Sequence, residues 1–231
     1  MAEIDDLFGE NFVCALCEDE IIDGGNCFLC DRCFKGLDFI SRACEKCGDR
    51  VGKFDRFCLN CKDNHKDFDY CVCVAKLKDT GKDLIYKLKY GKQPFVSKAI
   101  AELMLKKFRE SVKDDFDFIT YVPITRAKMK ERGFCQTEVI ARILANKLNI
   151  ELKENLILRI KDNKEQTELN KEERRKNLEG VFVIDDSIDL TGKKVLVVDD
   201  VYTTGATMQA MNKLLRSKNA LKVCGIMLCH T

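Results

Sequence analysis

The chain has 231 residues, 45% of them hydrophobic, and a formal net charge of +2 from 40 basic and 38 acidic side chains. This allows one large globular domain or two smaller ones, and it excludes an overall electric field that would steer the chain to nucleic acid. The amino-terminal residues lack the basic and apolar regions of a signal peptide, and no apolar run approaches the roughly 18 residues of a membrane span. We therefore expect a cytosolic, cytoplasmic protein without a membrane span.

The cysteines are distributed unevenly. Of the 14 cysteines, all but Cys135, Cys224 and Cys229 fall between Cys14 and Cys73. This shift in composition predicts a cysteine-rich module over residues 1–67, followed by a domain of ordinary composition over residues 68–231. In a reducing compartment, metal binding explains so many cysteines better than disulfides do.

Four Cys-x-x-Cys pairs indicate the metal ligands: Cys14 and Cys17, Cys30 and Cys33, Cys44 and Cys47, Cys58 and Cys61. Two thiolates three positions apart can face one ion, and a second pair completes a tetrahedral four-thiolate set for Zn²⁺. We expect sequential pairing, 14/17 with 30/33 and 44/47 with 58/61, as in a double zinc ribbon. A cross-braced pairing of 14/17 with 44/47 stays open, as does the number of occupied sites, one or two. About sixty residues of low apolar content need such structural staples.

Other cysteines and the two histidines have simpler interpretations. Cys27 also forms a Cys-x-x-Cys pair with Cys30, and we interpret it as a bystander. Cys71 and Cys73 alternate within an expected strand, which indicates core thiols. His65 and His230 are expected at the surface.

Beyond the module, apolar patterns predict strands alternating with helices. Strands are expected at residues 70–77, 117–124, 156–161, 181–184, 193–199 and 221–229. Helices are expected at residues 83–111, divided near Gly91 and Pro94, and at residues 134–150 and 206–219. Alternating strands and helices indicate an α/β fold, with a parallel sheet covered by helices on both faces.

The segment VLVVDDVYTTGAT, residues 195–207, joins a buried strand to a helix through two carboxylates and a threonine-rich turn. Ligands of parallel sheets bind beyond the carboxyl ends of the strands, where Asp199 and Asp200 are expected. The turn of Thr203, Thr204, Gly205, Ala206 and Thr207 leads into a helix N-terminus, whose free N–H groups suit a phosphate. The carboxylates suit vicinal hydroxyls or a divalent cation. The pattern thus indicates a ribose 5-phosphate.

Three alternatives fit this segment less well. A P-loop needs a lysine after its last glycine, and none follows Gly205. A receiver domain carries its acid pair near its start, whereas only 24 residues follow Thr207 here. A capped turn without a ligand leaves two adjacent carboxylates at a sheet edge without a partner.

Two further segments carry charge in suitable places. Arg126, Lys128, Lys130 and Arg132 follow the strand that ends near Pro123, in an expected loop with a turn at Gly133, and suit pyrophosphate. Residues 163–180 form a long polar stretch, interpreted either as a mobile hood over substrate or as a plain surface segment. Its expected contacts are Gln166, Arg174, Arg175 and Asn177. Lys89 and Tyr90 either approach the site or only end a helix.

The acid pair followed by TTGAT resembles the signature of type I phosphoribosyltransferases. Together with the paired cysteines, LKYGK, VPITRAKMKERGFCQTEVIA and QTELNKEERRKNLEGVF, in this order, it resembles the ComF family over nearly the whole chain. The resemblance implies a type I phosphoribosyltransferase-like fold that binds phosphoribosyl pyrophosphate (PRPP) with Mg²⁺. It implies that Asp199 and Asp200 contact the ribose hydroxyls and that residues 203–207 hold the 5-phosphate. It also implies a role in DNA uptake during natural transformation, with single-stranded DNA and a DNA-uptake helicase as partners.

Three hypotheses about function follow. The first is Mg²⁺-dependent phosphoribosyl transfer, as in a metabolic amidophosphoribosyltransferase, with Asp199, Asp200 and Arg132 in the catalytic site and Arg126, Lys130 and Arg174 among the PRPP contacts. The second is a DNA-handling module. Its expected contacts are the basic and aromatic residues of the cysteine-rich part, Arg32, Lys35, Arg42, Lys46, Arg50, Lys53 and Arg56 with Phe28, Phe34, Phe39, Phe54 and Phe57. The third is a regulator that binds PRPP without turnover. Our combined prediction is a ComF-like competence protein that binds PRPP and single-stranded DNA.

Overall fold

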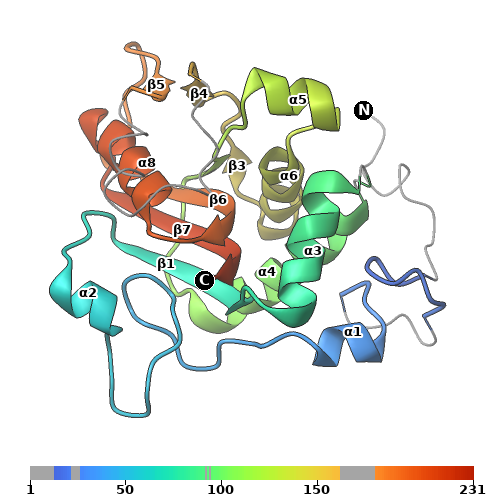
Figure 1. Cartoon of the computed structure of the whole chain (residues 1–231). Coiled ribbons are helices and arrows are strands. Elements are labelled where there is room, and N and C mark those ends of the chain that lie inside the picture. Colours follow the sequence, from blue (N-terminus) through green and yellow to red (C-terminus); the bar gives the residue numbers. More distant parts are fainter. Residues whose placement is uncertain (1–12, 22–26, 92, 94, 162–179) are drawn as a thin grey trace.

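The computed structural model describes residues 13–21, 27–91, 93, 95–161 and 180–231 (Figure 1). The strands are β1 (Tyr70–Lys76), β2 (Phe118–Tyr121), β3 (Glu151–Leu152), β4 (Ile157–Arg159), β5 (Phe182–Ile184), β6 (Lys194–Tyr202) and β7 (Lys222–His230). The helices are α1 (Asp31–Lys35), α2 (Leu59–Asp63), α3 (Asp79–Tyr90), α4 (Phe95–Ser111), α5 (Arg126–Arg132), α6 (Gln136–Leu148) and α8 (Ala206–Ser217).

Five strands form one parallel sheet in the order β1-β7-β6-β2-β3, with β6 in the centre. Helices α3, α4 and α6 lie on one side of this sheet and α8 on the other (Figure 1). Within β6, Leu196 and Val198 belong to the core under α4 and α6, whereas Val195 and Val197 belong to the core under α8. This alternation within one apolar run is the pattern of a strand that is buried on both faces. The predicted α/β fold with a parallel sheet is confirmed.

The cysteine-rich part covers the edge of the sheet at β1. The Ile40 amide donates to the Val74 carbonyl, and the Cys71 amide donates to the Lys46 carbonyl, both within 2.9 Å. Phe39 forms an antiparallel bridge with Ala75. An exposed edge strand is a template for pairing with other chains, so these bonds protect β1.

Several expectations differ from the structure in detail. The expected loop after β2 is the short helix α5, since Thr125 caps it by accepting a hydrogen bond from the Lys128 amide at 3.1 Å. The turn after it is present, with Gly133 at φ 84°. The expected strands at 156–161 and 181–184 pair antiparallel with each other as β4 and β5, outside the main sheet.

The expectation for His230 was wrong. The side chain is buried and stacks on Tyr202, with ring centroids 4.7 Å apart, because β7 pairs with β6 as far as this residue. His65 is exposed as expected, and Cys71 and Cys73 are core thiols as expected.

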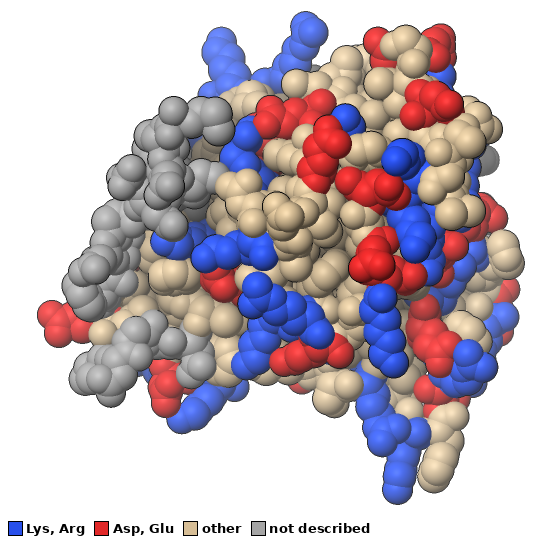
Figure 2. All heavy atoms as spheres, turned by 180° about the vertical axis from the view of Figure 1, so that it is seen from behind, with Lys and Arg blue, Asp and Glu red and all other residues tan. Residues whose placement is uncertain are grey.

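The surface carries charges of both signs. On the face opposite to that of Figure 1, basic and acidic side chains alternate over short distances (Figure 2). This agrees with the net charge of +2. Within the described ranges, no helix combines the length and the apolar character that crossing a membrane requires.

Candidate functional site

The two adjacent carboxylates lie within the central strand rather than after it. β6 continues for two residues past Asp200 and ends at Tyr202. Successive side chains of a strand point to opposite faces. Asp200 faces α3, where its Oδ2 lies 2.9 Å from the Nζ of Lys89. The structure therefore brings Lys89, whose role the sequence left open, into contact with the acid pair.

Asp199 has a different electrostatic environment. Burial, reinforced by repulsion from Asp200, raises the pKa of Asp199 to about 7, because a carboxylate removed from water is disfavoured in its charged form. The charges of Lys89 and Arg159 oppose this effect. For Lys89, burial lowers the pKa, but attraction to Asp200 outweighs it and the net pKa is raised. Arg159, at the end of β4, is a neighbour of the acid pair that the sequence pattern did not single out.

The threonine-rich turn connects β6 to the first turn of α8. Gly205 caps the helix in the left-handed region, at φ 80°, where a side chain is strained. A Cβ at this position would also lie 2.2 Å from the Tyr202 hydroxyl. Both the backbone conformation and the close approach of Tyr202 therefore require glycine at position 205. The Ala206 amide bonds to the Thr204 hydroxyl at 3.3 Å, and Thr203 and Thr207 are partly buried.

Residues 66–68, which follow the second cysteine group, contact this turn and the start of α8. The Nζ of Lys66 donates to the Thr204 carbonyl at 3.1 Å, and the Asp67 amide donates to the Oε1 of Gln209 at 2.9 Å. The Phe68 ring packs edge-on against Tyr202, at 6.3 Å between centroids. Residues 66–68 therefore fix the entry to α8 without occupying its amide groups.

The basic residues of α5 differ in exposure. Arg126 and Lys130 are exposed and one helical turn apart. Arg132 is partly buried, donates to the Oε1 of Gln136 at 3.1 Å, and places its guanidinium 5.7 Å from the ring centre of Tyr90. Its charge also acts on Lys89, so α5 approaches the acid pair through Arg132. The other predicted contacts, Gln166, Arg174, Arg175 and Asn177, lie outside the described residues.

Two groups of four thiols gather in the described structure, Cys14, Cys17, Cys30 and Cys33 in one and Cys44, Cys47, Cys58 and Cys61 in the other. This is the sequential pairing, and Cys27 belongs to neither group. Within each group the sulfur atoms lie within 4.8 Å of one another. The Sγ atoms of Cys17 and Cys30 are 3.6 Å apart, and those of Cys47 and Cys58 are 3.5 Å apart. Tetrahedral zinc with bonds of about 2.3 Å requires sulfur separations of about 3.8 Å, so both groups can hold Zn²⁺.

The two cysteine groups pack on opposite faces of the domain. Cys14 and Cys33 join the core under α3 and α4, whereas Cys44 and Cys47 join the core under α8. At the second group, Gly48 has φ 76°, and a Cβ there would lie 2.8 Å from the Cys71 carbonyl oxygen of β1. This close approach ties the second group to the sheet.

The aromatic residues predicted for DNA contact differ in exposure. Phe28 and Phe34 are partly buried, with Phe28 edge-on against Phe95 and Phe34 in contact with Phe39. Phe39 and Phe57 are exposed to 36% and 37%, and Phe54 to 91%. Four of the associated cations form ion pairs, Arg32 with Asp19, Lys35 with Asp31, Arg50 with Asp38 and Arg56 with Glu45.

Comparisons with known proteins agree with this architecture. Residues 136–230, from α6 to the end of β7, match the phosphoribosyl transferase domain family. Competence protein F of Haemophilus influenzae is 27% identical over 213 residues, which cover 89% of this chain and 91% of that protein. DNA utilization protein YhgH of Escherichia coli K12 is 25% identical over 211 residues, which cover 90% of this chain and 92% of that protein.

A solved structure of a larger enzyme is also similar. The glutamine phosphoribosylpyrophosphate amidotransferase from B. subtilis, complexed with ADP and GMP, is 17% identical with a TM-score of 0.42. The match covers 61% of this chain and 30% of that one. The domain match and the parallel sheet together confirm the predicted type I phosphoribosyltransferase-like fold class.

Proposed function

We propose that this chain, a ComF-like relative of competence protein F that contains a phosphoribosyl transferase domain, binds PRPP with Mg²⁺ and handles single-stranded DNA. The resemblance to relatives named for competence and DNA utilization extends over about 90% of the chain. The observation that carries the PRPP part is the acid pair of β6 placed three residues before the turn that opens α8.

In this proposal the turn binds the 5-phosphate. Residues 203–207 lead into the first turn of α8, whose amide groups have no acceptor within the helix and lie at the positive end of its dipole. Glycine at position 205 allows the left-handed turn that opens α8 and makes room for Tyr202. The threonine hydroxyls add donors. On binding, the phosphate therefore replaces its hydrogen bonds to water with several hydrogen bonds to the protein.

The acid pair then binds the ribose hydroxyls, directly or with Mg²⁺. Carboxylate oxygens are the protein ligands that Mg²⁺ prefers, and a cation beside Asp199 favours release of the proton that burial retains. Mg²⁺ supplies charge neutralisation for the pyrophosphate when it is bound. Lys89 holds Asp200 in place, and Arg132, with exposed Arg126 and Lys130 on the same helix, provides positive charge for pyrophosphate.

Isothermal titration calorimetry tests the binding step. We expect saturable binding of PRPP with Mg²⁺ to one site per chain, at least tenfold weaker in the Asp200→Asn variant. Asp186→Asn is the matched control, since its side chain is fully exposed on the segment before β6. Wild-type protein that binds no PRPP at millimolar concentration would refute the proposal.

Turnover is a separate question. Pyrophosphate release in the presence of PRPP, Mg²⁺ and a panel of nucleobases and amines distinguishes a transferase from a regulator that only binds PRPP. We also propose a cytoplasmic location, because cysteines stay reduced there and the chain has 14 of them. A DNA-uptake helicase stays a predicted partner.

A further inference from the structure

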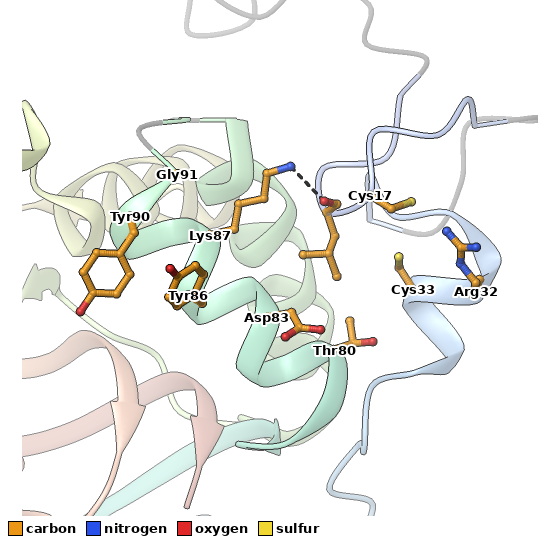
Figure 3. Close-up of a pocket in the computed structure, with 10 residues that line it drawn as sticks. Cys17, Arg32, Cys33, Thr80, Asp83, Tyr86, Lys87, Tyr90 and Gly91 are labelled. Carbon is orange, nitrogen blue, oxygen red and sulfur yellow. Dashed lines mark hydrogen bonds between the residues drawn. The ribbon is translucent and has the colours of Figure 1, made fainter. Parts of the chain in front are cut away.

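A cavity in the described part of the chain lies outside the phosphate-binding turn, between α3 and the first cysteine group. Its volume is about 640 Å³, and it lies next to Cys17, Cys33 and the side chains of one face of α3 (Figure 3). The wall on the cysteine side is fixed to the helix, because the Nζ of Lys87 donates to the Leu16 carbonyl at 2.9 Å and pairs with Glu18 at 2.7 Å. These two contacts of Lys87 hold the two walls of the groove together.

Two tyrosines form the helix side of this groove. Tyr86 and Tyr90 are one turn apart on α3, with ring centroids 5.0 Å apart, and are 66% and 57% exposed. The two rings are inclined at 45° to each other, and both are accessible to a ligand from solvent. The other described tyrosines, Tyr70, Tyr121 and Tyr202, are partly or fully buried.

The polar groups of the groove suit a nucleotide. Asp83, on the same helix face, can accept a hydrogen bond from a base N–H group, such as the N3–H of thymine (Figure 3). Arg32, which forms an ion pair with Asp19, lines the groove beside the cysteines. Arg132 lies next to the groove, 5.7 Å from the ring centre of Tyr90. Aromatic platforms flanked by cations are the general means of binding single strands without reading their sequence.

The Tyr90 end of the groove is close to the surroundings of the acid pair, because Arg132 lies over the Tyr90 ring and its charge also acts on Lys89. Tyr90 lines the groove, while the preceding residue, Lys89, forms the ion pair with Asp200. Two neighbouring rings fit two successive bases of a strand, whereas a free nucleotide needs only one.

We propose that this groove, lined by Asp83, Tyr86, Tyr90 and Arg32 and flanked by Arg132 at Tyr90, binds single-stranded DNA by stacking successive bases on the two tyrosines. The inference deepens the DNA-handling part of the proposed function and moves it from the phenylalanines of the cysteine-rich part to α3.

The test combines two measurements on the full zinc-loaded chain. A labelled oligothymidylate of twenty nucleotides gives the affinity at low salt by fluorescence anisotropy. Tyrosine fluorescence reports the stacking itself, because the chain has five tyrosines and no tryptophan. We expect the oligonucleotide to quench this fluorescence, and the Tyr86→Leu/Tyr90→Leu variant to bind at least tenfold more weakly.

Three companion variants or ligands decide the outcome. Tyr86→Phe/Tyr90→Phe keeps the stacking faces and is expected to bind as the wild type does. Phe54→Leu removes the phenylalanine that is most exposed among the described residues. A loss of binding in this variant but not in the double leucine variant would overturn the proposal in favour of the cysteine-rich part. Thymidine monophosphate that competes as well as the oligonucleotide, at equal nucleotide concentration, would overturn a strand as the ligand.

Failure here is separable from failure of the proposed PRPP site. Wild-type protein that binds PRPP in calorimetry but no oligonucleotide at low salt would refute the groove proposal and leave the PRPP proposal standing. Wild-type protein that binds the oligonucleotide with tyrosine quenching but no PRPP would do the reverse.

Discussion

Asp199 and Asp200 are adjacent in sequence, but their surroundings stabilise the charged carboxylate of Asp200 and disfavour that of Asp199. Asp200 has a cationic partner, Lys89, at 2.9 Å, whereas burial raises the pKa of Asp199 to about 7. A carboxyl whose pKa is raised in the folded state destabilises that state once it is ionised. The unligated protein therefore holds an unfavourable charge at neutral pH, which a bound cation would offset.

The first prediction concerns Asp199→Asn without Mg²⁺. An unfolded Asp has a pKa of about 3.9, so the folded state binds more protons between about pH 4 and pH 7, and stability falls as pH rises through this range. The asparagine variant lacks this loss. We therefore expect the melting temperature of the variant to exceed that of the wild type by more at pH 8 than at pH 5. The free energy of unfolding involved is at most about 4 kcal/mol, which corresponds to a pKa difference of about three units. An identical difference at both pH values would contradict the raised pKa.

The second prediction concerns Asp200→Asn, which acts in the opposite direction. Removing this carboxylate leaves the partly buried Lys89 without its partner, so we expect a loss of stability of about 1–3 kcal/mol. Lys89→Met in the same chain should restore much of it. Chemical denaturation of both single variants and the double variant measures the coupling. Additive effects would show that the ion pair is energetically unimportant.

At the scale of elements, the loop between the second cysteine group and β1 supports the turn before α8. Lys66 bonds to the Thr204 carbonyl, and Phe68 packs on Tyr202. No local pattern in the sequence links these residues, because the contact joins positions 138 apart. The sequence therefore predicted the turn and its helix but not their support.

Lys66→Ala should weaken PRPP binding by about three- to tenfold, since one hydrogen bond from a charged donor is lost beside the phosphate-binding turn. Lys62→Ala is the control, because Lys62 pairs with Asp55 at the surface of the cysteine-rich part. Calorimetry of both variants measures the effect. Equal affinities in the two variants would show that the turn is formed without this support.

The accuracy of the sequence predictions followed the kind of signal in each element. The apolar runs of β6 and β7 and the amphipathic α6 were placed to within a few residues, because periodicity reports burial directly. The sequence predicts a loop where α5 lies, because Arg126–Arg132 contains only two apolar residues, Ala127 and Met129, and the cap at Thr125 gives no clear signal. His230 was misplaced because a polar residue at a strand end does not reveal the ring that stacks on it.

At the scale of the whole molecule, the cysteine-rich part and the sheet share their cores. The first cysteine group packs on one face of the sheet and the second on the other, and residues 38–40 lie along the edge of β1. The boundary after residue 67 stays a proposal. Contacts across it lead us to expect that the two parts unfold together.

Metal content tests this arrangement. Because the thiols form two separate groups of four, we predict that elemental mass spectrometry finds two zinc ions per wild-type chain. The Cys14→Ser variant and the Cys44→Ser variant should each retain one zinc ion. Removal of both ions should lower the melting temperature of the whole chain in a single transition. One zinc in the wild type would mean that one group is not a metal site.

The central claim is that the turn before α8 and the acid pair of β6 hold one phosphorylated ribose between them. A crystal structure with PRPP and Mg²⁺ measures this most directly. We predict the 5-phosphate on the backbone amides of residues 203–207 and the ribose hydroxyls, or Mg²⁺, beside Asp199 and Asp200. Density for PRPP at another place, with this turn free of phosphate, would contradict the account.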